Sequence, residues 1–102
     1  MRAMVVDVAG GYDALVLKDV PTPELRRNDV LIEVEACGVC FHDVVTRNGV
    51  MKRGVKMPLI PGHEVSGVVA KVGPAVRMFK EGDRVCTVQR RHICGACRYC
   101  RT

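Results

Sequence analysis

Aromatic residues are scarce in this chain of 102 residues, which contains no tryptophan, two tyrosines and two phenylalanines. Single-stranded nucleic acids are bound largely by stacking bases on aromatic rings, so this composition disfavours nucleic acid as a partner. Long apolar runs are also missing from the sequence. None approaches the roughly 18 residues of a membrane span, and the first residues lack the apolar stretch of a signal peptide. We therefore expect a cytoplasmic protein without a membrane partner.

Cysteine is too infrequent for a disulfide scaffold, because six cysteines in 102 residues fall below the roughly 8–10% typical of that class. Half of them crowd near the end of the chain: Cys94, Cys97 and Cys100. In a cytosolic chain this spacing indicates a zinc site, since tight turns bring successive thiolates around one tetrahedral ion. The fourth ligand would come from His92, from Cys86 or from a residue after Thr102.

The charge balance is positive, with 16 Lys and Arg against 11 Asp and Glu and a net charge of +5. Arginines are frequent among residues 84–101, beside the cysteines. A basic patch of this kind can contact phosphate. It leaves open a second interpretation, a freestanding basic zinc module that binds nucleic acid or a protein.

Apolar periodicity and turn-forming clusters predict several short strands and one short helix. The expected strands cover residues 1–8, 14–20, 30–36, 65–72 and 84–88, and the helix covers residues 41–47. Gly10–Asp13 would join the first two strands as a hairpin, and Asn48-Gly49 would end the helix. Strands at this spacing describe a small barrel or sandwich. After Gln89 neither periodicity continues, so we expect one domain over residues 1–102, truncated within a loop that begins near residue 90.

Three local features add detail to this pattern. Ile32, Val34 and Ala36 alternate with glutamates, which predicts a half-buried strand. Gly67 lies inside a strand, where glycine marks a bulge or a close backbone approach. Cys86 is expected to be a buried apolar filler.

Cys40 and His63 each close a loop beside a strand, so a barrel could bring both to one rim, where they could share a metal ion. A cysteine and a histidine are also common as packed or surface residues, and Cys37 with Cys40 could form a redox pair. The residues alone leave these alternatives open.

A pattern of spaced residues runs through the middle of the chain: Gly62-His63-Glu64, Gly67, Gly73 and Val76. It is flanked by Cys37-Gly38-Val39-Cys40 with Asp43, by Gly82-Asp83-Arg84-Val85 and by the clustered cysteines. In this order the motifs resemble those of the zinc-containing alcohol dehydrogenases, in the medium-chain dehydrogenase/reductase superfamily. The resemblance implies a mainly β fold, a partly open GroES-like β-barrel with one or two short helices and a cysteine-rich zinc-binding loop. It would be an N-terminal catalytic domain without the Rossmann domain.

The same resemblance implies an oxidoreductase that interconverts alcohols with aldehydes or ketones by hydride transfer with NAD or NADP, as a homodimer or homotetramer. Cys40 and His63 would be ligands of a catalytic zinc, Glu64 its acidic neighbour and a further candidate ligand, and Asp43 the partner that steadies the histidine. Three of the four ligands of a structural zinc would be Cys94, Cys97 and Cys100. We expect the 102 residues alone to be inactive, because the cofactor-binding half is missing.

His42 departs from the family pattern, since many alcohol-active members carry serine or threonine there, where the hydroxyl relays the substrate proton. An imidazole can serve as that relay, so His42 is a candidate catalytic residue together with Asp43 and Glu64. Relatives that reduce enoyl-CoA thioesters also lack the hydroxyl, which leaves an acryloyl-CoA-like reductase as the alternative. Neither the third catalytic ligand nor the fourth structural cysteine can be placed before Thr102.

Overall fold

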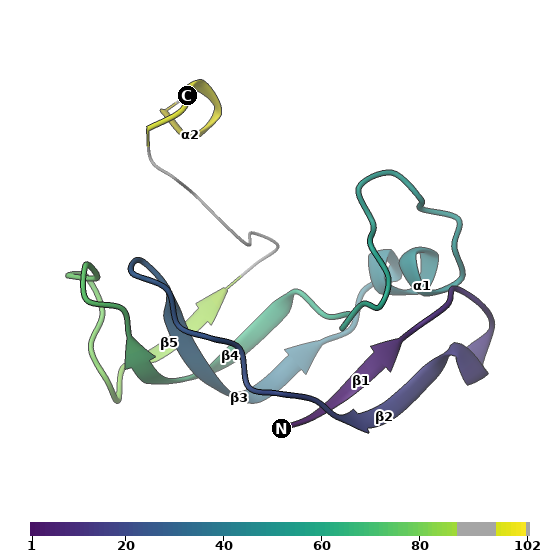
Figure 1. Cartoon of the computed structure of the whole chain (residues 1–102), viewed down its shortest axis with the longest axis horizontal. Helices are drawn as coiled ribbons and strands as arrows, with labels where there is room; N and C mark the ends of the chain where they lie inside the picture. Colours follow the sequence, from purple (N-terminus) through teal and green to yellow (C-terminus); the bar gives the residue numbers. More distant parts are fainter. Residues whose placement is uncertain (88–95, 102) are drawn as a thin grey trace.

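The computed structural model describes residues 1–87 and 96–101 and is mainly β (Figure 1). Its elements are β1 (Arg2–Val6), the 3-10 helix η1 (Tyr12–Ala14), β2 (Leu15–Asp19), β3 (Val30–Gly38), α1 (Phe41–Arg47), β4 (Glu64–Val72), β5 (Arg84–Thr87) and α2 (Arg98–Arg101). The expected strands and the helix over residues 41–47 are confirmed. The residue pattern did not predict the short helix α2, because a single turn of four residues carries too little periodicity to be recognised, whereas the family resemblance implied one or two short helices.

The strands form two antiparallel sheets, β1-β2 and β3-β4-β5 (Figure 1). The first is the predicted hairpin, although η1 rather than a plain turn joins its strands. Within residues 1–87 and 96–101 the two sheets are open and do not close into a barrel. A single bridge ties β1 to the loop before β4, where Val6 and Leu59 exchange backbone hydrogen bonds of 2.8 and 2.9 Å. The mainly β fold class is therefore confirmed, with open sheets.

The buried apolar core of the described residues is small and consists of Val5, Val6 and Val69. Contrary to expectation, Val34 is 56% exposed and Ala36 is exposed as well. All residues from Glu33 to Gly38 are exposed, so neither face of this part of β3 is covered by another described element, and alternation along the strand does not bury either side. Cys86 is also exposed instead of buried; it lies on β5, one of the two edge strands of this sheet among the described residues.

Gly67 confirms the predicted close backbone approach. It lies opposite Val34 in the β3-β4 ladder, is itself buried, and a Cβ atom placed on it would overlap the backbone oxygen of Glu33. Near this contact, Arg84 on β5 reaches over β4 and donates a 2.6 Å hydrogen bond to Glu35 on β3. The central strand β4 is thus held closely between its neighbours, and it begins directly after His63.

Candidate metal centre

The pairing of β3 with β4 places Cys40 beside His63. The ladder ends with Gly38 opposite Glu64, and Cys40 follows β3 as the N-cap residue of α1, whereas His63 immediately precedes β4. Both side chains therefore extend from the same end of an antiparallel pair. Cys40 Sγ lies 3.2 Å from His63 Nε2, although 23 residues separate them in the chain.

Asp43 connects the two candidate ligands. Its Oδ2 accepts a 3.1 Å hydrogen bond from the backbone N–H of Cys40, and its Oδ1 accepts one of 3.1 Å from Gly62. The same Oδ1 lies 3.3 Å from His63 Nδ1, and both side chains are mostly buried. The carboxylate thus faces one ring nitrogen and leaves the other directed at Cys40 Sγ. A carboxylate behind the histidine is the usual arrangement in which a protein fixes the tautomer of a metal ligand.

Two glycines of the sequence motifs leave the space that this arrangement needs. Gly62 has φ = +99°, and a Cβ atom on it would lie 2.7 Å from Cys37 Sγ. A Cβ atom on Gly38 would overlap the carboxylate of Glu64. Substitution at Gly62 would therefore displace the N–H that binds Asp43. Only the folded backbone reveals these contacts, because neither neighbour is adjacent in sequence.

His63 belongs to two sets of possible donor residues among the described residues. Within each set the donor atoms lie within 4.8 Å of one another. One set is Cys40, His63 and Glu64, and the other is His42, Asp43 and His63. The ring of His42 meets the ring of His63 edge-on, with centroids 5.1 Å apart and an interplanar angle of 89°. The structure thus brings together the residues expected at a catalytic zinc: Cys40, His42, Asp43, His63 and Glu64.

The Cys40–His63 pair fits zinc by the chemistry of its donors. A thiolate about 2.3 Å and an imidazole nitrogen about 2.0–2.1 Å from a tetrahedral zinc lie roughly 3.6 Å apart. The observed separation of 3.2 Å reaches that value with an adjustment of a few tenths of an ångström. The carboxylate of Asp43 at the far nitrogen of the ring agrees with the same function.

The expected structural-zinc ligands are only partly described. Cys97 Sγ and Cys100 Sγ lie 3.4 Å apart, and the backbone N–H of Cys100 donates a 3.1 Å hydrogen bond to the carbonyl of Cys97. This places two of the clustered thiols side by side at the start of α2. Cys94 and His92 lie outside the described residues.

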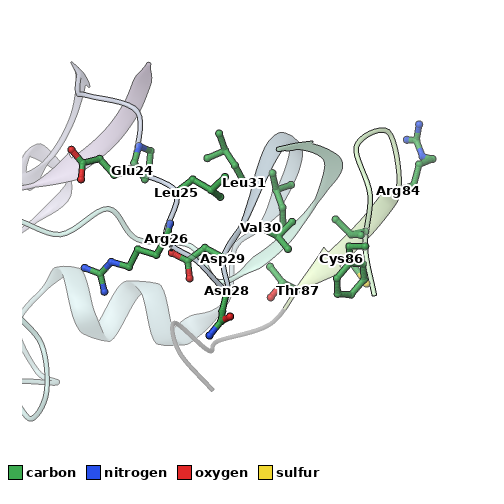
Figure 2. Close-up of a pocket in the computed structure, with 14 residues that line it drawn as sticks. Glu24, Leu25, Arg26, Asn28, Asp29, Val30, Leu31, Arg84, Cys86 and Thr87 are labelled. Atoms are coloured by element: carbon green, nitrogen blue, oxygen red, sulfur yellow. Dashed lines mark hydrogen bonds between the residues drawn. The ribbon is translucent and has the colours of Figure 1, made fainter. Parts of the chain in front are cut away.

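A separate groove of about 740 Å³ runs between residues 23–32 and β5 (Figure 2). Figure 2 shows Glu24, Leu25 and Arg26 along one side and Cys86 and Thr87 on the other. None of the donor residues around His63 lines this groove. It is therefore not the site at which we expect metal chemistry.

Comparison with known proteins agrees with the fold. The family model of the alcohol dehydrogenase GroES-like domain matches residues 26–102. An alcohol dehydrogenase from Geobacillus stearothermophilus is 44% identical over 89 residues, which are 87% of this chain and 26% of that protein. A quinone oxidoreductase from Lama guanicoe is 43% identical over 88 residues, which are 85% of this chain and 27% of that protein.

Solved structures show the same relationship. The structure of a cobalt- and zinc-bound thermostable alcohol dehydrogenase from Pyrobaculum aerophilum matches with a TM-score of 0.83 at 39% identity. The match covers 98% of this chain and 30% of that one. The chain thus spans between a quarter and a third of the length of these relatives. No helix among the described residues is long and apolar enough to cross a membrane.

Proposed function

The chain belongs to the family of alcohol dehydrogenase GroES-like domains, and from that premise we propose that it provides the zinc-binding part of an NAD- or NADP-linked oxidoreductase. The proposed substrates are alcohols, which the enzyme interconverts with aldehydes or ketones. The observation that carries this proposal is the 3.2 Å approach of Cys40 Sγ to His63 Nε2, with Asp43 facing the other ring nitrogen.

Cys40 and His63 would hold the zinc ion, which when bound acts as a Lewis acid on the substrate oxygen. Asp43 keeps His63 in the orientation in which Nε2 is free to bind, because its Oδ1 stays beside Nδ1 while backbone N–H groups hold the carboxylate in place. Glu64 lies over Gly38 with its carboxylate near both ligands. It supplies a negative charge and a further ligand atom at the same site.

His42 is the proposed proton carrier. It is half-buried, and its ring lies next to that of His63 in an edge-on arrangement, so it adjoins the proposed metal ligands. An imidazole accepts and releases a proton near neutral pH, which is what removal of the proton from an alcohol requires.

A reductase of conjugated double bonds is the second candidate, with enoyl-CoA thioesters as the proposed substrates. Two observations favour it, the imidazole at position 42 in place of a hydroxyl and the similarity to a quinone oxidoreductase. Assays of the full-length enzyme with primary alcohols and with enoyl-CoA thioesters distinguish the candidates. Reduction of only the thioester would exclude the alcohol dehydrogenase proposal.

For the full-length enzyme we propose a cytoplasmic homodimer or homotetramer with a structural zinc held by the thiols of Cys94, Cys97 and Cys100. The 102 residues contain no Gly-x-Gly-x-x-Gly motif for a dinucleotide. We therefore propose that they do not oxidise alcohols alone, and a measurable NAD-linked rate from this chain would contradict that.

Metal binding by the chain itself tests the proposed site. Cobalt substitutes for zinc and reports thiolate ligands through ligand-to-metal charge-transfer absorption. We expect Cys40→Ser and His63→Ala each to remove one of the cobalt sites of the chain. The matched control is Cys37→Ser, because this thiol belongs to the same motif, its Sγ lies where a Cβ atom on Gly62 would project, and it is not a proposed ligand. Equal losses from Cys37→Ser and Cys40→Ser would refute the assignment.

A further inference from the structure

His63 is shared by the two sets of donor atoms described above. We infer that His42, Asp43 and His63 form an alternative site for a divalent cation, and that an ion bound there excludes zinc from Cys40. The chemical class is a first-row divalent ion that accepts nitrogen and oxygen ligands, with Ni²⁺ as the representative. The exclusion of zinc rests on the proposed function, in which Cys40 and His63 are the zinc ligands. The existence of the second site does not depend on that function.

The two nitrogens of one imidazole explain the exclusion. His63 Nε2 lies 3.2 Å from Cys40 Sγ, and Nδ1 lies 3.3 Å from Asp43 Oδ1. A neutral imidazole has one nitrogen with a free lone pair, and the other carries the proton. An ion at Nδ1 therefore leaves the proton on Nε2, where it points at the sulfur of Cys40. His63 serves one ion at a time.

Asp43 retains the capacity to bind an ion at this position. Each carboxylate oxygen has two lone pairs, and one backbone N–H occupies one of them on Oδ1 and one on Oδ2. Oδ1 is the oxygen beside His63 Nδ1. An ion between these two atoms would also be within reach of the neighbouring His42 ring, which lies edge-on to His63. All three residues are partly buried, and two backbone N–H groups hold the Asp43 carboxylate in place.

The donor types decide which ion prefers which site. The first set contains a thiolate, a ligand that favours zinc among the abundant divalent ions. The second set offers two imidazoles, which suit Ni²⁺ as well as zinc, together with a carboxylate, and it contains no sulfur. We therefore expect zinc to prefer the site that includes Cys40 and Ni²⁺ to prefer the site that includes His42.

Nitrogen chemical shifts of the histidine rings test this inference on the full chain. Long-range ¹H–¹⁵N spectra show which ring nitrogen binds a diamagnetic ion, and His42→Gln and His63→Gln assign the signals. With Zn²⁺ we expect Nε2 of His63 to be bound in the wild type. In Cys40→Ser we expect Zn²⁺ to move to Nδ1 of His63 and to one nitrogen of His42. A Cys40→Ser chain in which zinc leaves both histidines unchanged would overturn the second site.

Affinities provide an independent readout. We expect His42→Gln to weaken Ni²⁺ binding by about tenfold or more and to change Zn²⁺ affinity at Cys40 much less. Equal effects on both ions would overturn the inference, and unchanged far-ultraviolet circular dichroism of His42→Gln excludes misfolding as the cause. If instead the wild type never binds zinc through Nε2 of His63, the proposed function fails while the second site can still be observed in Cys40→Ser.

Discussion

The two groups of residues that we propose as metal ligands are assembled in different ways. Cys40 and His63 are 23 residues apart and meet 3.2 Å from each other because the antiparallel pairing of β3 and β4 brings them to one end of the sheet. Cys97 and Cys100 are three residues apart, and their sulfurs lie 3.4 Å from each other at a short helix. The first group depends on tertiary structure, whereas the second depends on a single turn of the backbone.

Loss of the fold should therefore affect the two groups differently. Bringing distant residues together costs chain entropy that the paired strands must offset, and that cost is small for residues within one turn. A change that opens the sheet should therefore abolish the site at Cys40 and spare the clustered thiols.

The largest effect is expected from Gly67→Ala. The new Cβ would overlap the backbone oxygen of Glu33, so β3 and β4 must move apart and the chain loses about 3 kcal/mol or more of stability. Urea unfolding measures the loss, and cobalt spectra should show the clustered thiols still bound while Cys40 is not. Gly11→Ala is the matched control, because no atom lies within 4 Å of its Cβ position. Loss of both sites together would contradict the comparison.

Gly62→Ala should have the next largest effect. Its φ of +99° strains an L-residue, and the added Cβ would lie 2.7 Å from Cys37 Sγ. Gly82→Ala separates the two causes, since Gly82 has φ = +88° with no atom within 4 Å. We expect Gly62→Ala to destabilise the fold more than Gly82→Ala and to weaken zinc binding, because the N–H bound by Asp43 moves. Adding Cys37→Gly to Gly62→Ala should recover part of the loss, and no recovery would exclude the contact with sulfur as a cause.

Asp43→Asn should alter metal affinity more than folding. The amide carries no charge and has one acceptor oxygen where Asp43 uses two, and loss of such a partner typically weakens metal binding roughly 10–100-fold. Competition with a chromophoric zinc chelator measures the change at Cys40. The affinity of the clustered thiols should stay unchanged, so a parallel fall at both sites would show that Asp43 acts through global stability instead.

The smallest effect is expected at the turn before β5, far along the chain from His63. Lys80 holds the pKa of the Asp83 carboxyl below its usual 3.8, first because the Lys80 side chain donates a hydrogen bond to it and then because the Lys80 backbone N–H donates another. A carboxyl group whose pKa is lower in the folded than in the unfolded state stabilises the fold at pH values above the unfolded-state pKa. This stabilisation is lost as the pH falls through the folded-state pKa.

Unfolding of the wild type and of Asp83→Asn should therefore differ above pH ~4 and converge in stronger acid. Because the pair is exposed, the difference should be slight, and neither metal site should respond. A difference that grows as the pH falls would contradict this sign.

Much of the local structure was predictable from sequence. The strands around Val5, Val16 and Val69 carry apolar patterns that predict them, and Asn48-Gly49 ends α1 where expected, with Gly49 at φ = +81°. Predictions of burial succeeded less well. Val34 and Cys86 are exposed in the structure, because burial depends on whether another element covers the face of a strand, which an apolar pattern in one strand does not reveal.

Residue order alone determined the short-range features of this protein: the spacing of the clustered cysteines, the extent of α1 and the hairpin at the start of the chain. These depend on neighbours within a few residues, so local preferences settle them. The family resemblance implied that Cys40 and His63 share a zinc ion, but the geometry of the site depends on the tertiary structure. That geometry includes the 3.2 Å approach of the two side chains, the position of Asp43 at Nδ1 rather than Nε2, and the lack of room for a side chain on Gly62. Those outcomes depend on distant segments whose separation is known only once β3 and β4 have paired.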